Sequence, residues 1–459
     1  MVASRIILPL LSCLLISLSM DVASREIILI SLSPISYAAA NRAGYMVFFW
    51  SGFLVNIVFQ THYLKALFDY LGPLYGGASY IAIVIAMAAP YALISPIVRL
   101  KCISSPAMRV WSTILLTASI WLITDNILPS KYWIELAESP WALWFVREGG
   151  ELLLVAIIGL VSALLSFLFI LDGLILRLCS GITLVLIISL LHLITPGLSD
   201  HPHRLPGAVV GVQLGRNELA EAKHGLISGE YNEITTIKNA FQYASRNLLP
   251  GWLGVIPELT YGPMIDDNAD IMTYKSLTEI FGFTLLINGS VHAPDGRNLI
   301  RASSVISPNS YPLHIVKKSH LVPFFESMEN EDGIRYIEGR DFDKFIYSEW
   351  GSIQSLLCLE LFDRYFLSHS KTPITLVVVA ADTSKFNHGS VSRHILHTAM
   401  FQAQVAKAPV LVVDYGGPSF ISWPDGVAYQ ITSKDEKAAF IIYPDGNTVV
   451  IPEDDWIVL

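Results

Sequence analysis

The sequence predicts a multi-helix membrane domain followed by a water-soluble α/β domain. Of the 459 residues, 53% are hydrophobic and only 15% are charged, which is too apolar for an ordinary soluble protein. The apolar residues concentrate before about residue 197, and most of the charged residues follow it. After Leu205, short β-branched runs alternate with helical stretches, a pattern that predicts strands layered with helices.

These composition shifts set the predicted domain boundaries. We expect a transmembrane domain over residues 1–197, a Pro- and His-containing linker over 198–206, and an α/β domain over 207–459. The formal net charge of −9 argues against a nucleic-acid partner, because phosphate binding needs clustered Lys and Arg.

The N-terminal half contains about seven candidate membrane helices, each of which needs about 20 mostly apolar residues. With the N-terminus in the cytoplasm, the basic residues fall in the cytoplasmic loops, as the positive-inside tendency requires. These residues are Arg42, then Arg99, Lys101 and Arg109, then Arg177. Seven crossings then put the C-terminal domain outside the cytoplasm. The candidate segments lie near residues 5–23, 26–40, 45–60, 78–98, 110–128, 151–171 and 177–196.

The C-terminal half contains strand and helix candidates in alternation. A final hairpin is expected after Ala439, turning at Pro444-Asp445-Gly446. Helices are expected at Glu218–Leu226, Ile234–Asn247 and Val391–Ala406. Strands are expected at Ala208–Val212, Trp252–Pro257, Phe283–Ile287, Ser303–Ser307, Ile353–Cys358, Thr375–Ala380, Pro409–Val413, Ala428–Thr432, Ala439–Tyr443 and Thr448–Ile451.

Three short stretches carry residues with a joint chemical use. An apolar strand delivers Glu258 after Pro257, a second stretch carries Lys318, and a third ends in Cys358, the only one of four cysteines outside the apolar half. A thiol attacks as its thiolate and is mostly protonated at neutral pH, so it needs a base. A glutamate can take the proton, and a lysine can stabilise the thiolate and then an oxyanion. This trio suits acyl transfer through a thioester.

Each of the three residues also has an ordinary interpretation. A lone buried cysteine on a strand is usually a packing residue. A Pro-Glu pair after a strand usually forms a turn, and a Lys-Lys pair usually lies on a solvated face. His394 and His397 share a helix face, which we interpret as a polar face, so we predict no metal site and no cofactor.

The motifs resemble those of the nitrilase, or carbon–nitrogen hydrolase, superfamily. The match is closest to its membrane-bound branch, the apolipoprotein N-acyltransferases. The family's Lys-x-His-Leu-Val-Pro-Phe-Gly-Glu is similar to Lys318-Ser-His-Leu-Val-Pro-Phe-Phe-Glu326, and its Cys-Tyr-Glu to Cys358-Leu-Glu360. Phe325 and Leu359 depart from those motifs. The resemblance implies a nitrilase-like αββα sandwich on the C-terminal side of the membrane domain.

The resemblance also implies roles for individual residues. Cys358 would be the nucleophile, Glu258 the general base and Lys318 the thiolate and oxyanion partner. Glu326 and Glu360 match accessory glutamates, which we expect to orient Lys318 and the leaving group.

The activity implied is a membrane-anchored acyltransferase. A phospholipid would donate the acyl group and a lipoprotein-like amine would accept it, in a multi-pass protein of the bacterial inner membrane with its C-terminal domain in the periplasm. Two alternatives remain open. One is a nitrilase-type amidase acting on a soluble substrate, and the other is a non-catalytic component of an envelope or conjugal-transfer complex.

Overall fold

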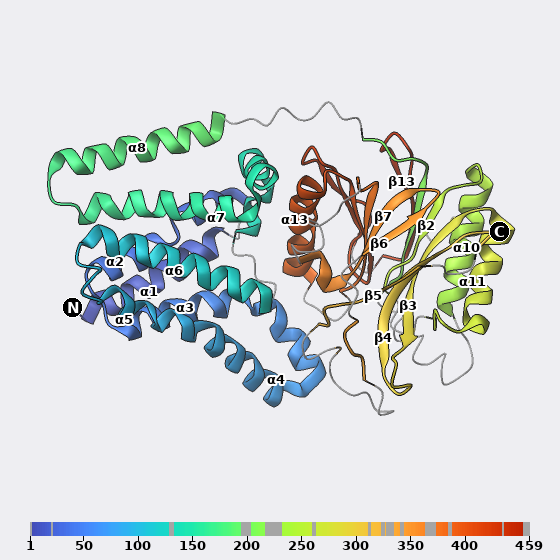
Figure 1. The fold of residues 1–459 in the computed structure, drawn as a ribbon, viewed down its shortest axis with the longest axis horizontal. Helices are drawn as coiled ribbons and strands as arrows, with labels where there is room; N and C mark the ends of the chain where they lie inside the picture. The colour runs from blue at the N-terminus through green and yellow to red at the C-terminus, as the bar shows by residue number, and fades with distance from the viewer. Residues whose placement is uncertain are drawn as a thin grey trace. The chain divides into compact units, whose positions relative to one another are not determined.

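The chain divides into two compact units in the computed structural model: unit 1, Met1–Gly197, and unit 2, Leu198–Leu459 (Figure 1). Each unit is described by itself. The residues that the structure describes are 2–19, 22–127, 133–193, 203–215, 232–258, 263–310, 314–322, 326, 335–339, 344–362, 373–383, 388–433 and 436–452.

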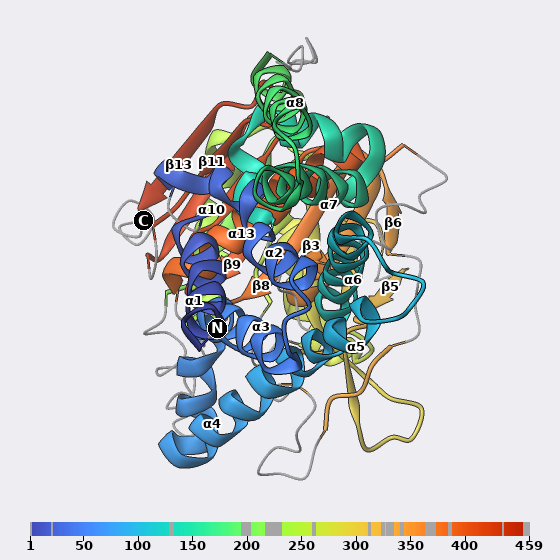
Figure 2. The same cartoon turned by 90° about the vertical axis from the view of Figure 1, so that its left-hand side faces the viewer.

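Unit 1 is helical throughout the part of it that the structure describes. Figure 2 shows α8 at the edge of the bundle, beside α7. The elements are α1 (Val2–Ser19), η1 (Val22–Ile30), α2 (Ser33–Ala40), α3 (Tyr45–Phe59), α4 (Thr61–Ala92), α5 (Ile94–Val98), α6 (Pro106–Ile127), η2 (Ile134–Glu138), α7 (Pro140–Ile170) and α8 (Leu174–Leu193).

Four helical segments among the described residues are long and apolar enough to cross a membrane, and two apolar segments are shorter. The long ones match the last four predicted segments. The shorter ones, Glu26–Ala40 and Tyr45–Val58, match the second and third. The long segments are Leu71–Val98, Pro106–Thr124, Pro140–Ile170 and Leu174–Leu193.

Three of the predicted segments differ in detail from the helices observed. The segment at 26–40 is split into η1 and α2. Helices α4 and α7 begin earlier than predicted, and each contains a kink at a glycine, Gly72 (φ 76°) or Gly150 (φ 68°). A positive φ is outside the right-handed helical region and costs a glycine little, so each glycine joins two helical stretches at a kink.

Three interhelical loops with basic residues in or near them interact closely or share one apolar cluster. The Arg99 guanidinium donates to the carbonyls of Arg42 and Ala43, and Arg109 donates to the carbonyl of Ala40 over 2.8 Å. Ala40 also belongs to an apolar cluster against which Leu171 packs. The loops near residues 41–44, 99–105 and 171–173 therefore meet at one end of unit 1.

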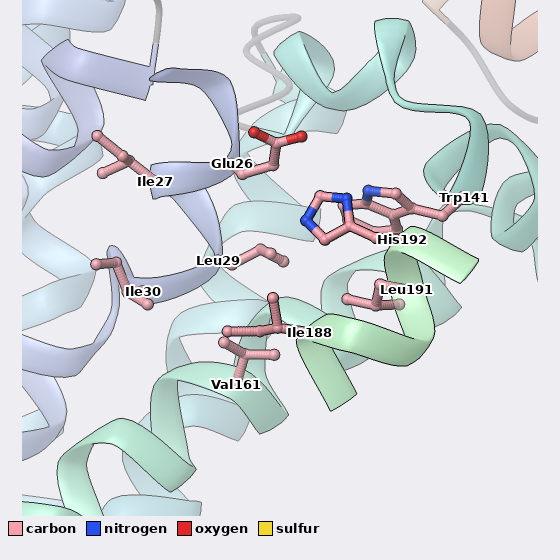
Figure 3. A pocket seen from close by; sticks show the side chains of 9 residues that line it. All are labelled: Glu26, Ile27, Leu29, Ile30, Trp141, Val161, Ile188, Leu191 and His192. Carbon is pink, nitrogen blue, oxygen red and sulfur yellow. The ribbon is translucent and has the colours of Figure 1, made fainter. Parts of the chain in front are cut away.

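A cavity of about 240 Å³ lies between η1, α7 and α8. Figure 3 shows Glu26, Trp141 and His192 toward one end of it, and Val161 and Ile188 toward the other. The remaining lining residues are aliphatic, namely Ile27, Leu29, Ile30 and Leu191. The cavity is therefore apolar along its length, with polar groups at one end.

Unit 2 is built on two β-sheets. Sheet A has the order β13-β12-β1-β2-β3-β4-β5, and sheet B the order β11-β10-β9-β8-β7-β6. The strands of sheet A are β1 (Val209–Gln213), β2 (Leu253–Val255), β3 (Thr284–His292), β4 (Leu299–Ile306), β5 (Ile315–Lys317), β12 (Ala438–Ile442) and β13 (Thr448–Pro452). Those of sheet B are β6 (Phe345–Ser348), β7 (Gly351–Leu357), β8 (Leu376–Asp382), β9 (Val410–Tyr415), β10 (Phe420–Ser422) and β11 (Ala428–Gln430).

The two sheets pack face to face between outer helices, so unit 2 is an αββα sandwich, as predicted. Figure 1 shows α10 (Asn232–Asn247) and α11 (Asn268–Phe281) on the outer face of sheet A, and α13 (His388–Ala406) on that of sheet B. Three apolar clusters fill the spaces between the layers. One lies under α10 and α11, one lies between the sheets and one lies under α13.

Most of the predicted strands and two of the three predicted helices are present in unit 2. The final hairpin forms, with β12 antiparallel to β13 and Gly446 at φ 86° in its turn. The sequence analysis missed β5, β6, β10 and α11. The predicted helix Glu218–Leu226 lies outside the described residues. Within the predicted linker, His203 stacks on Trp423 of unit 2 and lies 2.7 Å from Asp425.

Candidate active site

The ends of three strands bring the predicted trio together. In sheet A, β2 leads to Glu258 and β5 to Lys318, and in sheet B, β7 leads to Cys358. Strand β2 is parallel to β3. Strand β4 is antiparallel to both β3 and β5, so β5 runs in the same direction as β2 and β3. Their carboxyl ends therefore lie at one edge of sheet A, where side chains that follow parallel strands meet.

Lys318 lies between two carboxylates. Its Nζ atom donates to Oε1 of Glu258 over 3.1 Å and to Oε1 of Glu326 over 2.7 Å. The Lys318 side chain is fully buried, and those of Glu258 and Glu326 are 6% and 15% exposed. The second oxygen of Glu326 accepts from the Val322 amide over 2.7 Å, which fixes this carboxylate in its own turn. The motif resemblance, rather than spacing alone, led to these residues. The structure shows that Glu258 is the second carboxylate on Lys318.

Cys358 occupies a tight turn directly after β7. It opens the 3-10 helix η3 (Cys358–Phe362) and has a φ of 48°, in the left-handed region that few residues other than glycine adopt. The predicted strand thus ends one residue earlier, at Leu357. The backbone of Asp382 hydrogen-bonds the sulfur, and the charges of Lys318, Glu258 and Glu326 all act on it. The thiol therefore lies close enough to the lysine and to both carboxylates for their charges to act on it.

The site holds its groups in defined protonation states. Burial raises the pKa of the Cys358 thiol, and the opposing effect of Lys318 is too small to reverse that shift. Burial by itself lowers the pKa of the Lys318 ammonium, but Glu258 and Glu326 outweigh it and raise that pKa above its usual value. The resting site therefore contains a neutral thiol and a charged lysine.

The two carboxylates on Lys318 differ in their acidity. Burial raises the pKa of Glu258, and the attraction of Lys318 only partly offsets this rise. For Glu326, burial is outweighed by Lys318 and by the Val322 amide, which hold its pKa below the usual range. Glu258 is therefore the carboxylate better suited to accept a proton near neutral pH.

Two further residues contact Glu258 or the chain just before it, and neither was predicted from the sequence. Nε of Arg301, in β4, lies 3.8 Å from Oε1 of Glu258, and its guanidinium stacks 4.4 Å from the ring of Tyr336. The Asn288 side chain donates to the carbonyl of Ile256 over 2.7 Å, just before Pro257. A charged residue inside an otherwise apolar strand was the available signal for Arg301.

Glu360 occupies a different position from the one expected. Among the described residues its carboxylate pairs with Lys344 over 2.8 Å and accepts from the amides of Ser319 and Leu357. It therefore does not orient Lys318 by direct contact, because its bonds go to the backbone beside Lys318 and Cys358. The sequence analysis did not select Lys344.

A buried carboxyl group lies within β9, near its carboxyl end. Asp414, in β9, accepts from the amide and the hydroxyl of Thr383 over 2.9 and 2.7 Å. Burial raises the pKa of Asp414 to about 8, so it is protonated at neutral pH. A Cβ atom at Gly417 would lie 2.2 Å from the Thr383 hydroxyl and 2.5 Å from the Asp414 carboxyl, so this position requires glycine.

The histidines of α13 do not form the solvated face that the sequence suggested. His394 and His397 are 6% and 1% exposed, so they face the protein interior. Within the described ranges, no group of three or more His, Cys, Asp or Glu side chains could hold a metal ion. Of the two departures from the family motifs, Leu359 is half-buried and Phe325 lies outside the described residues.

No family model and no curated protein matches the chain. Among solved structures, it is similar to an amidase from Nesterenkonia sp. (13% identity, TM-score 0.39, covering 56% of this chain and 93% of that one). It is also similar to Nit3 of Saccharomyces cerevisiae, a member of branch 10 of the nitrilase superfamily (12%, 0.39, 55% and 93%). A third is the glutamine-dependent NAD+ synthetase of Acinetobacter baumannii (13%, 0.39, 51% and 45%). At identities and scores this low, the αββα assignment of unit 2 rests on its own strand order.

Proposed function

We propose that unit 2 is a cysteine-dependent acyl-transfer enzyme of the carbon–nitrogen hydrolase type. The observation that carries the proposal is the buried Lys318 ammonium, bonded to Glu258 and Glu326 and near enough to the Cys358 thiol for its charge to act on the sulfur. A buried lysine is costly unless carboxylates pair with it, so the cluster is a specific arrangement. A thiol with a raised pKa needs a base and a cation to react. The cluster supplies both.

The proposed reaction has two halves. Glu258 takes the thiol proton as the sulfur attacks the acyl carbonyl, and Lys318 stabilises the oxyanion that forms. The carbon–oxygen or carbon–nitrogen bond then breaks, and Glu258 returns the proton to the leaving alcohol or amine. In the second half, Glu258 takes a proton from the acceptor, which attacks the thioester and releases Cys358 as its thiol.

We further propose that the donor is a membrane phospholipid and that the acceptor is an amine, such as the N-terminus of a lipoprotein. The helices of membrane length in unit 1 support a lipid donor. The apolar cavity between η1, α7 and α8 adds a volume in which an acyl chain can be held. Every step uses only side chains of this chain, and the mechanism calls for no cofactor.

The test is to incubate the purified full-length protein with phospholipid that carries a labelled acyl chain. We expect a labelled adduct that hydroxylamine releases, located on the Cys358 peptide by mass spectrometry and absent from Cys358→Ala. A labelled adduct that persists in Cys358→Ala would contradict the proposal. Addition of a peptide with a free N-terminal amine should discharge the thioester and label the peptide.

An amidase acting on small soluble amides is the second candidate. It is favoured by Leu359, which replaces the aromatic residue of the acyltransferase motif beside the nucleophile. Such an enzyme would use water as the acceptor, with the same three residues. Turnover of soluble amides, together with no labelling by phospholipid, would support it. A folded protein that neither labels nor turns over amides would instead support a non-catalytic role in an envelope or conjugal-transfer complex.

We propose that the protein is a multi-pass protein of the bacterial inner membrane, with unit 2 in the periplasm. Arg42 and Arg99, in two loops, and Arg109, near the start of α6, converge at one end of unit 1. This supports the orientation, since basic residues at helix ends are retained in the cytoplasm. A reporter that is active only outside the cytoplasm, fused after Leu459, should be active. An inactive fusion at normal expression would contradict the orientation.

A further inference from the structure

A second buried ion pair lies beside the proposed catalytic residues. Nζ of Lys344 is 2.8 Å from Oε1 of Glu360, and their side chains are 0% and 1% exposed. Removing two charges from water is costly, and burial is tolerated only when further hydrogen bonds satisfy both groups. The partners that satisfy this pair therefore indicate what the pair holds in position.

Those partners are backbone groups on both sides of Lys318 and directly before Cys358. Glu360 accepts from the Ser319 amide over 2.6 Å and from the Leu357 amide over 3.0 Å. Lys344 donates to the carbonyl of Lys317. The pair thus fastens the end of β5, in sheet A, to the end of β7, in sheet B.

The main chain of Lys344 is also fixed to β7. Its carbonyl accepts from the Ser355 amide over 2.9 Å. Lys318 is in turn held from the other side, because its amide donates to the Arg301 carbonyl over 2.7 Å. Both charges of this pair therefore contact the backbone beside Lys318, and that of Glu360 also contacts the backbone beside Cys358.

We propose that Lys344 is a positioning residue, whose ion pair with Glu360 sets the separation of Lys318 and Cys358. The inference rests on the proposed function of these two residues. Lys344 neutralises the carboxylate that bridges the two strand ends. Without Lys344, the carboxylate would be left as a buried charge, and the bridge between the strand ends would relax. Small displacements of reacting groups have large effects, since a shift of about 1 Å can cost roughly 100-fold in rate.

The test compares Lys344→Met with Lys275→Met in the full-length protein. Lys275 is a matched control, because it is also buried, pairs with Glu279 at 3.4 Å, and donates to the carbonyls of Ser307 and Pro308. Both variants lose a buried ammonium of unit 2. We expect Lys344→Met to slow formation of the hydroxylamine-sensitive adduct roughly 10- to 100-fold, with the effect on kcat rather than KM, and Lys275→Met to retain the wild-type rate.

A second readout does not depend on acyl chemistry. The rate at which iodoacetamide modifies Cys358, followed on its own peptide by mass spectrometry, reports how well Lys318 supports the thiolate. Lys344→Met should slow this rate and Lys275→Met should not. If the wild-type protein forms no adduct with phospholipid, the proposed function fails, and the alkylation rates alone decide the positioning role.

Glu360→Gln completes the experiment. Gln keeps one acceptor oxygen and turns a donor toward the other amide, so this variant should lose as much rate as Lys344→Met. Lys344→Met/Glu360→Gln should lose no more than Glu360→Gln alone, because both changes break the same bridge. If Lys344→Met does not fold, as judged by its unfolding transition, Glu360→Gln carries the test. Wild-type adduct and alkylation rates in either folded variant would overturn the proposal.

Discussion

Nζ of Lys318 donates to Oε1 of Glu258 over 3.1 Å, although the two residues are 60 positions apart in the sequence. The contact joins the ends of two parallel strands of sheet A at the edge where Cys358 arrives from sheet B. A base and a cation are therefore in contact before any substrate is bound. Because of this hydrogen bond, we expect both the activity and the stability of unit 2 to depend on the Lys318 ammonium.

Replacement of Lys318 by methionine should reduce both activity and stability. It removes the oxyanion donor, which is worth about 100- to 1,000-fold in rate. It also leaves Glu258 and Glu326 buried without their cation, which is expected to cost about 3–5 kcal/mol. Adduct formation and chemical unfolding of the variant measure the two effects.

The control for this change is the neighbouring residue. Lys317→Met removes a half-buried lysine from the same strand end but keeps the backbone carbonyl that Lys344 uses. It should change adduct formation only slightly. Equal losses in Lys317→Met and Lys318→Met would mean that the local charge, rather than contact with the two carboxylates, is what matters.

The pH dependence of acylation should follow Glu258. Because burial raises the pKa of Glu258, this carboxylate is protonated at pH values at which an ordinary glutamate is already ionised, and a protonated base cannot accept the thiol proton. The rate kcat/KM should therefore fall with decreasing pH, with a midpoint above the ordinary glutamate value. The pH–rate profile of the wild-type protein measures this midpoint.

Glu258→Gln provides the matching control. It should lower the rate at all pH values and should remove the acidic limb of the profile. If the acidic limb persists with the same midpoint in Glu258→Gln, the titrating group is not Glu258. Glu326 is a poor alternative, since Lys318 and the Val322 amide hold its pKa below the usual range.

Stability should fall as the pH rises through the titration of Asp414. The pKa of this carboxyl is raised from 3.8 to about 8 in the folded state, so the unfolded chain releases its proton first. Neutral Asp414 contributes its full stabilisation at pH values below the pKa that this carboxyl has in the unfolded chain. The stabilisation is lost as the pH rises toward the pKa that it has in the folded protein. Asp414→Asn removes the titration and nearly preserves the shape.

The prediction is tested with the unfolding temperature of both proteins. At about pH 9, Asp414→Asn should unfold at a higher temperature than the wild-type protein, and at about pH 5 the advantage should disappear or reverse. Gly417→Ala serves as the steric comparison, because its Cβ would clash with Asp414 and Thr383 at every pH. An Asp414→Asn effect that does not vary with pH would contradict the prediction.

The local sequence motifs identified the proposed catalytic residues better than the residues that hold them in place. Lys318 and Glu326 belong to one short motif, and the hydrogen bond between them joins residues only 8 positions apart. Lys344, Arg301 and the contacts of Glu360 depend on how β4, β5 and β7 pack, which no local pattern encodes. The contacts of Glu360 were not predicted for this reason, and the orienting role expected for it stays a prediction. Its motif position is local, but its partner is set by tertiary structure.

The same distinction holds for the fold. Strands such as β8 and β9 are continuous apolar runs, which sequence patterns identify well. Helix α11 was missed because its apolar residues are mixed with polar ones, although it has clear end signals. The Asp267 side chain caps its first turn through the Ala269 amide, and Gly282 ends it at φ 68°. In unit 1, the break between η1 and α2 also has a signal that the prediction did not use, namely Pro34 in the first turn of α2.

The cavity of unit 1 predicts a selective effect on the lipid reaction. Val161 is fully buried and lines the cavity, so Val161→Trp should fill it. If the cavity holds the donor's acyl chain, labelling by phospholipid should fall several-fold, while iodoacetamide should modify Cys358 at the wild-type rate. Leu152→Trp, at a position of α7 that is 59% exposed, is the control and should leave both rates unchanged. Unchanged labelling in Val161→Trp would show that the cavity does not hold the acyl chain of the donor.

The backbone at Cys358 predicts an unusual order of stability between two inactive variants. Alanine at this position keeps a Cβ atom at a φ of 48°, which costs about 1–2 kcal/mol, whereas glycine adopts this conformation freely. Glycine also loses more chain entropy on folding, by about 0.4–1 kcal/mol, so the net advantage of Cys358→Gly over Cys358→Ala should be about 1 kcal/mol. In α13, where φ is helical, Ala399→Gly should instead destabilise by about 1 kcal/mol. Chemical unfolding of the three variants tests the order, and a Cys358→Gly variant less stable than Cys358→Ala would show that the turn is not strained.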